Sequence, residues 1–158
     1  MLGTLTPTED GRFALRFERT FAHSPEKVWR AITETEELKG WFPAVVDLTR
    51  PEGETVVFEF PNGQAPTTEG RIIRSDPPRT LEYTWGDELL RWELTPQGDG
   101  CHAVFTNVFD ERESGVPTGA GWHAGLEVLA ARLDGREVGW APMDRAGELT
   151  QKYAAVFG

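Results

Sequence analysis

The sequence is poor in cysteine and histidine and has no long apolar run. It contains one cysteine, Cys101, and three histidines, His23, His102 and His123. A single cysteine forms neither an internal disulfide nor a Cys-x-x-Cys pair, so we expect a reducing compartment, no metal site and no cofactor. The opening MLGTLTPTEDGR lacks the basic and apolar regions of a signal peptide, and no segment is long enough to span a bilayer. We therefore expect a cytoplasmic protein.

Basic residues are in the minority. Sixteen lysines and arginines stand against twenty-six aspartates and glutamates, which gives a formal net charge of −10. Such a surface repels phosphate backbones and anionic lipid headgroups, so we expect neither nucleic acid nor a membrane as partner. The length is typical of one domain, and we predict a single domain over 1–158. Its core spans about 13–136, with a helical extension over about 137–158.

The usual catalytic motifs are missing as well. There is no Gly-x-Ser-x-Gly, no His-Glu-x-x-His and no phosphate-binding glycine loop. Glu59, Glu69, Glu82 and Glu93 alternate with apolar residues, which is typical of the solvated face of a sheet. Cys101 has no neighbouring base and is expected to be a packing residue. These absences favour a binding protein over an enzyme.

Most of the chain has the period-two alternation of half-buried strands. A first strand is predicted over 12–21. Six more follow, separated by turns too short for parallel crossovers, over 44–50, 54–60, 67–75, 79–85, 89–95 and 101–109. About seven strands therefore form an antiparallel sheet.

Two short helices are predicted after the first strand. Ser24 is a suitable N-cap, and Pro25 occupies the first helical position, where its missing N–H costs nothing. Thr33 and Glu36 have the spacing of a capping box, which predicts a second brief helix that ends near Gly40.

Two further helices are predicted after the sheet. A long one over 119–134 has an apolar stripe that the sheet would bury, made of Trp122, Leu126, Leu129 and Leu133. After a bend at Trp140 and Pro142, another begins near Asp144, with a stripe of Ala146, Leu149, Tyr153 and Val156. Its packing on its own chain or on a second subunit is left open.

Four segments in order resemble a known family. FAHSPEKVWRAITETEELKGWF, SDPPRTLEYTW, WELTPQGDG and GWHAGLEVLAARLDG are similar to successive parts of the activator of heat-shock-protein-90 ATPase homologue family, over about 13–136. That family belongs to the START-like (SRPBCC) helix-grip superfamily. The resemblance implies an α+β helix-grip fold: a curved antiparallel sheet wrapped on a long C-terminal helix, usually with a cavity between them.

The alternation along the strands and the positions around the helix predict which residues line such a cavity. The candidates are mostly aromatic, and an ordinary packed core is the alternative explanation for each of them. They are Trp41, Phe42, Phe58, Phe60, Tyr83, Trp85, Trp92, Phe105, Asn107, Trp122, His123 and Leu126.

Two of the candidates are polar. His123 is predicted to orient a carbonyl or carboxylate of a ligand, unless it is solvated or bonded locally. Asn107 is the other polar candidate for the ligand's polar end, but it stands where many relatives carry histidine, which weakens any acid–base role implied by the resemblance.

Gly121 and Gly125 lie one turn apart in the long predicted helix. Interior glycine costs about 0.8–1.0 kcal/mol relative to alanine, so both positions require a reason. Either they leave room in the cavity or they permit a close packing contact.

The favoured function is binding of a small hydrophobic or amphipathic molecule without chemical change. One alternative is a co-chaperone that docks on a heat-shock ATPase through its surface. The other is a cyclase or hydrolase of the polyketide-cyclase branch, which requires ionisable groups inside the cavity. Monomer and homodimer are both compatible with the sequence.

Overall fold

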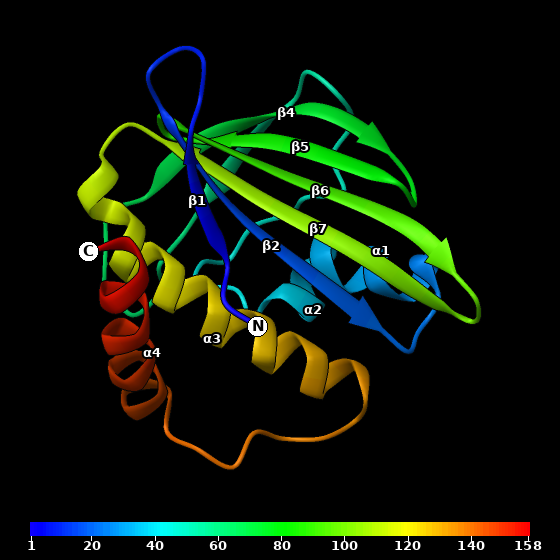
Figure 1. Ribbon diagram of the computed structural model, residues 1–158. Helices are drawn as coiled ribbons and strands as arrows, with labels where there is room; N and C mark the ends of the chain where they lie inside the picture. Colours follow the sequence, from blue (N-terminus) through cyan, green and yellow to red (C-terminus); the bar gives the residue numbers. More distant parts are fainter.

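Seven antiparallel strands form one sheet in the computed structural model, which describes residues 1–158 except for the side chains of Pro142 and Met143. Their spatial order is β1-β2-β7-β6-β5-β4-β3 (Figure 1). The strands are β1 (Thr4–Pro7), β2 (Phe13–Phe21), β3 (Thr55–Phe58), β4 (Thr68–Asp76), β5 (Thr80–Trp85), β6 (Glu88–Gln97) and β7 (Gly100–Phe109).

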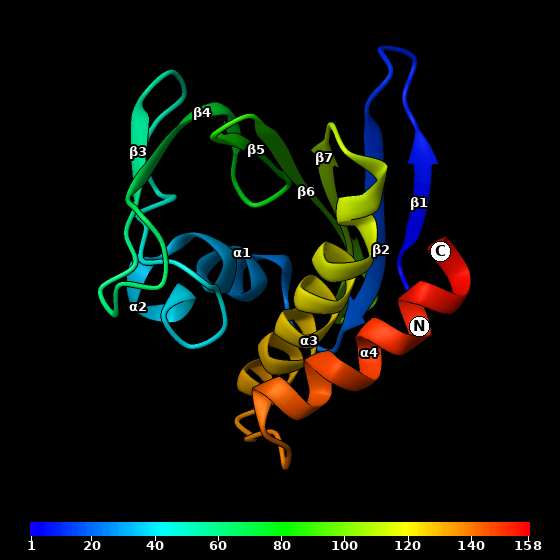
Figure 2. The ribbon, with the colours of Figure 1, turned by 90° about the vertical axis from the view of Figure 1, so that its left-hand side faces the viewer.

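The helices are α1 (Pro25–Thr33), α2 (Thr35–Leu38), α3 (Gly115–Leu133) and α4 (Pro142–Phe157). Figure 2 shows α3 against the concave side of the curved sheet, with α1 and α2 toward the β3 end and α4 on the β1 side. This arrangement confirms the predicted α+β helix-grip fold. No helix in the described part of the chain combines the length and apolar character needed to cross a bilayer.

The stripe on α3 packs into the core as predicted. Trp122, Leu126, Leu129 and Leu133 are all buried, and Leu129 is completely inaccessible. The helix begins at Gly115, four residues before the predicted start, directly after a 3₁₀ turn over Arg112–Ser114. Burial of this stripe against the sheet makes α3 the element that closes the core.

The first helix begins as predicted, but the capping box is wrong. The Ser24 side chain accepts a hydrogen bond from the Lys27 backbone N–H, and Pro25 opens α1. Thr33 is the last residue of α1, and its hydroxyl donates to the Trp29 carbonyl oxygen at 2.7 Å. The N-cap of α2 is therefore Glu34, which makes no side-chain capping bond.

The strand predicted over 44–50 is also wrong. Its alternate residues Ala44, Val46 and Leu48 are buried, but the segment makes only an isolated bridge between Val45 and Glu59. Two of its backbone groups bond to α1 and α2 instead: the Leu48 N–H donates to the Thr33 carbonyl oxygen, and the Thr35 hydroxyl donates to the Val46 carbonyl oxygen. The seventh strand is instead β1, which pairs with β2.

Helix α4 packs on α3 of the same chain. Leu149 and Tyr153 are fully buried, and Phe157 continues the stripe, whereas the predicted Val156 is 60% exposed. The carboxylate of Glu127 on α3 accepts two hydrogen bonds from the Arg145 guanidinium, at 2.6 and 2.8 Å. Burial raises the pKa of Glu127, but the hydrogen bonds from Arg145 together with the nearby positive charges of Arg145 and Arg19 leave that pKa lowered. The helix starts at Pro142, two residues before the predicted Asp144.

Candidate functional site

A cavity of about 930 Å³ lies between α3, the segment after α2 and the turn joining β5 to β6. Because these elements are far apart in sequence, the grip of the sheet on α3 is what creates the space. The lining residues fall into four groups: 39–43; Thr68, 85–88 and Asn107 from the sheet; Thr118, Gly121, Trp122, Ala124, Gly125 and Val128 from α3; and Val138, Trp140 and Ala146 beyond it.

Aromatic rings form one wall of this cavity. The Trp85 ring stacks on Phe58 with centroids 4.5 Å apart and on Phe42 at 5.4 Å. Phe42 also contacts Trp122 at 5.6 Å, and Trp122 meets the edge of Phe105 at 4.9 Å. Offset and edge contacts at these distances favour a fixed arrangement of rings, so this wall is preformed.

The structure divides the twelve predicted residues into three sets. Five line the cavity: Trp41, Phe42, Trp85, Asn107 and Trp122. Five others do not line it but belong to the same network of ring contacts: Phe58, Phe60, Tyr83, Trp92 and Phe105. The last two, His123 and Leu126, are buried on other sides of α3.

The polar group at the centre of the cavity wall is Asn107, which is completely buried. Its Oδ1 accepts a hydrogen bond from the Trp122 indole N–H at 2.9 Å. Its Nδ2 donates to Oε1 of Glu88 at 3.0 Å and to the Leu89 carbonyl oxygen at 3.4 Å. Because an indole only donates and a carbonyl only accepts, these partners fix the orientation of the amide. The side chain is therefore held rigidly.

The indoles of Trp85 and Trp41, which also line the cavity, are likewise hydrogen-bonded within the protein. The Trp85 N–H donates to the Thr68 hydroxyl oxygen at 2.7 Å, and the Trp41 N–H donates to the Ala31 carbonyl oxygen at 2.9 Å. Buried polar groups that are paired in this way leave their apolar ring surfaces to face the cavity.

Gly121 and Gly125 both face the cavity. A Cβ built at Gly121 has no atom within 4 Å, and one at Gly125 meets only the Trp41 backbone oxygen and ring at 3.6 and 3.8 Å. Close packing is instead the role of Gly119, where a Cβ would lie 3.2 Å from the Tyr153 ring. Different glycines of α3 therefore border the cavity, Gly121 and Gly125, and contact α4, Gly119.

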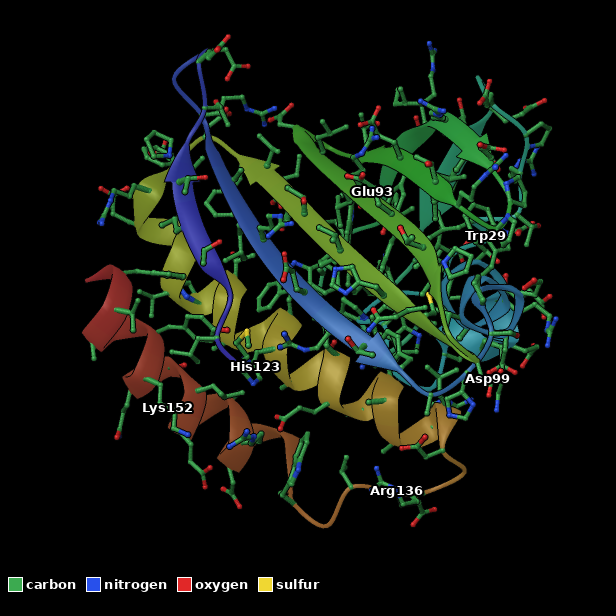
Figure 3. All side chains as sticks on the ribbon, turned by 45° about the vertical axis from the view of Figure 1, so that its right-hand side comes forward. Trp29, Glu93, Asp99, His123, Arg136 and Lys152 are labelled. Atoms are coloured by element: carbon green, nitrogen blue, oxygen red, sulfur yellow. The ribbon has the colours of Figure 1, made fainter. Side chains whose placement is uncertain are left out.

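His123 does not line the cavity. It projects from α3 toward the N-terminal residues and α4 (Figure 3), and its Nδ1 lies 2.8 Å from the Tyr153 hydroxyl oxygen. That hydroxyl also accepts a hydrogen bond from the Gly3 backbone N–H at 2.8 Å. Burial, followed by the nearby charge of Arg19, lowers the pKa of His123 to about 4. The imidazole is therefore neutral at pH 7 and joins α3 to α4.

Sequence reasoning missed Glu88 and the segment after α3. Leu90, Trp92 and Leu94 were assigned correctly to the inner face of β6. Extending the same alternation by two residues toward the turn would have placed Glu88 on that face. Val138 and Trp140, by contrast, lie outside any strand or helix, so no periodicity could have identified them.

Comparisons with known proteins agree with this fold. Residues 22–134 match the family described as Activator of Hsp90 ATPase homolog 1-like protein. The structure is similar to CalU16 from Micromonospora echinospora, with a TM-score of 0.75 at 23% identity, covering 98% of this chain and 95% of that one. It is similar to EF2215 from Enterococcus faecalis, a conserved protein of unknown function, with a TM-score of 0.77 at 20% identity and coverage of 98% and 91%.

BPP1335 from Bordetella parapertussis is similar with a TM-score of 0.72 at 25% identity, covering 89% of this chain and 84% of that one. A comparison with curated protein sequences gives no significant match. The match over 22–134, which is more than half of the chain, together with a sheet that wraps a long helix, shows that this chain belongs to the Activator of Hsp90 ATPase homolog 1-like family, within the START-like helix-grip superfamily.

Proposed function

We propose that this protein binds a small apolar, aromatic molecule in the cavity beside α3, without transforming it. The observation that carries the proposal is the preformed wall of Phe42, Trp85 and Trp122 facing two glycines across a space of about 930 Å³. Ligand pockets typically enclose about 300–1,000 Å³, lined mostly by apolar and aromatic side chains with a few polar groups. The cavity has this size and this composition.

The chemistry of the lining favours binding over catalysis. Within the described residues, the ionisable side chains that line the cavity are Lys39, Asp87 and Glu88, and all three are exposed. A cyclase needs an acid or base held against its substrate in a water-excluded site. His123, the ionisable residue predicted to lie in the cavity, faces Tyr153 instead. The buried Tyr83 phenol has its pKa raised by burial, so it stays protonated, and it does not line the cavity.

The experiment is a fluorescence titration with N-phenylnaphthylamine, a neutral probe that brightens in an apolar environment. Gly121→Leu should abolish binding because the added side chain enters space that is empty in the native protein. The matched control is Gly147→Leu on α4, since a Cβ at Gly147 also meets nothing within 4 Å and Gly147 does not line the cavity.

We expect saturable binding to the native protein and to the Gly147 variant, and none to the Gly121 variant. Equal binding to all three proteins would place the probe elsewhere and contradict the proposal. Absence of binding to any of them would favour the alternative in which the protein docks on a heat-shock ATPase through its surface.

A further inference from the structure

We infer that the ligand of this cavity presents a hydrogen-bond donor, most favourably a protonated amine, to the carboxylate of Glu88. This inference rests on the proposed function, because it names the chemical class of the molecule that the cavity takes.

Glu88 is an acid on the inner face of the sheet. It is the first residue of β6 and shares its face with Leu90 and Trp92, both of which are buried in the core. The remaining glutamate of this strand, Glu93, points to the outer face (Figure 3), where it accepts a hydrogen bond from Arg91. The Glu88 carboxylate is exposed and lines the cavity, so it can contact a ligand bound there.

The described part of the chain supplies Glu88 with a neutral hydrogen-bond donor but with no counter-charge. Oε1 of Glu88 accepts a hydrogen bond from the Asn107 amide, and Asn107 is itself fixed by Trp122 and by the Leu89 carbonyl. Among the described side chains, no lysine or arginine lies within ion-pair distance of Glu88 or of its neighbour Asp87. The carboxylate is thus oriented by a neutral donor and has no ion-pair partner among the described side chains. Arg12 donates to the Asp87 backbone carbonyl oxygen, but its ion pair is with Asp110.

The lysine at the mouth of the cavity is already paired with a glutamate. Lys39 lines the cavity, but its Nζ lies 3.0 Å from Oε1 of Glu36, which does not. A ligand at the mouth of the cavity therefore meets two carboxylates without ion-pair partners among the residues described, Asp87 and Glu88, and one lysine, Lys39, that already has a counter-charge. Neutral donors remain at Trp140 and at the threonine hydroxyls, and these cannot offset two negative charges.

A protonated amine satisfies both features of this end of the cavity. Its N–H groups form a charge-assisted hydrogen bond to the carboxylate, and its charge lies near the electron-rich faces of Trp85 and Trp122. A ligand carboxylate in the same place would be repelled by Glu88 and Asp87. Among ligands with the same aromatic ring system, the expected affinity is therefore highest for the amine, lower for the hydrocarbon and lowest for the acid.

The experiment uses three naphthalenes that differ in a single substituent: naphthylmethylamine, methylnaphthalene and naphthoic acid. Each competes with N-phenylnaphthylamine at pH 7 for the native protein, for Glu88→Gln and for Glu93→Gln. The glutamine at 88 keeps a carbonyl oxygen for the Asn107 amide, so the fold is retained. The Glu93 variant removes the same charge from the outer face of the same strand, and it controls for general attraction of cations to an acidic protein.

We expect the amine to bind the native protein about tenfold more tightly than methylnaphthalene, the effect of one charge-assisted hydrogen bond at a partly solvated site. Glu88→Gln should remove that preference and leave methylnaphthalene unaffected, whereas Glu93→Gln should keep it. Equal affinities of the three compounds for the native protein would overturn the inference and leave the proposed function standing. An amine preference that survives in Glu88→Gln, or that Glu93→Gln removes equally, would overturn the role of Glu88. Failure of methylnaphthalene to compete with a bound probe, or failure of any probe to bind, would instead refute the proposed function.

Discussion

Replacing Gly121 by alanine should stabilise the protein, although glycine is the residue found there. Glycine in a helix interior costs about 0.8–1.0 kcal/mol relative to alanine. A methyl group at Gly121 meets no atom within 4 Å, so no steric term opposes that gain. We therefore expect Gly121→Ala to raise the free energy of unfolding by about 1 kcal/mol, which corresponds to about 2–4 °C in Tm for a domain of this size.

Gly119→Ala is the informative comparison, because it lies two residues away on the same helix. There the new methyl group would approach two carbons of the Tyr153 ring at 3.2 and 3.3 Å. Contacts this short require the buried Tyr153 ring to move by a few tenths of an ångström, and overpacking of this kind opposes the gain in helix propensity. We expect Gly119→Ala to give no increase in stability or a loss.

Urea unfolding followed by circular dichroism measures both variants, with Gly147→Ala on α4 as a reference for an open helical glycine. Gly121→Ala and Gly147→Ala should shift the midpoint upward by similar amounts. A loss of stability in Gly121→Ala would mean that α3 packs against something at this position, and the assignment of Gly121 to an open cavity would be wrong.

Three further changes test other parts of the structure. Leu129→Ala should cost about 2–5 kcal/mol, as for other buried leucines, and a urea midpoint close to that of the native protein would show that the stripe on α3 is not core. Tyr83→Phe removes a buried hydroxyl without a hydrogen-bond partner among the described atoms, so calorimetry should show a gain of about 1 kcal/mol, and a loss would reveal a bonded partner. For His123 the folded-state pKa of about 4 lies below the ordinary 6.5, so the unfolded chain takes up the proton first as the pH falls. The free energy of unfolding should therefore decline from pH 6.5 toward pH 4 by at most about 3 kcal/mol more than in His123→Gln, and identical pH profiles of the two proteins would contradict the lowered pKa.

The inward faces of most strands could be predicted because burial on one face imposes a period of two. The alternation in LLRWELT and CHAVFTNVF assigned Leu90, Trp92, Phe105 and Asn107 to the inner face, and all four are buried. The same alternation failed over 44–50, because a loop that lays every second side chain on the core has the pattern of a strand. What separates the two is the partner of the backbone, which for Leu48 is a helix and not a strand.

The cavity was harder to predict than the core, since both use the same residues. Trp85 lines the cavity and Phe58 stacks on it from behind, yet both occupy inward positions of the sheet, on β5 and β3, with β4 between them. The sequence pattern indicates which side of a sheet a ring faces and not how deep it lies. Only the curvature of the sheet over α3 decides which rings border empty space.

The sequence did not reveal which neighbour each side of α3 would contact, and this limited the prediction for its polar residues. Gly121, Trp122 and His123 are consecutive, and about 100° separates each from the next around the helix. Gly121 therefore faces the cavity, Trp122 borders both the cavity and strand β7, and His123 faces α4. Without the position of α4, the sequence could not tell which side His123 would take.

The indole N–H resonances of the six tryptophans give the most direct test of the cavity as a binding site. A ¹⁵N–¹H spectrum recorded as N-phenylnaphthylamine is added reports on all of them at once. Trp41, Trp85, Trp122 and Trp140 line the cavity, whereas Trp29 is half-buried on α1 and does not. Binding in the cavity predicts saturable shifts among the first four signals with the Trp29 signal unchanged. Shifts confined to Trp29, or no shift of Trp85 and Trp122 at a probe concentration that saturates the fluorescence, would contradict it.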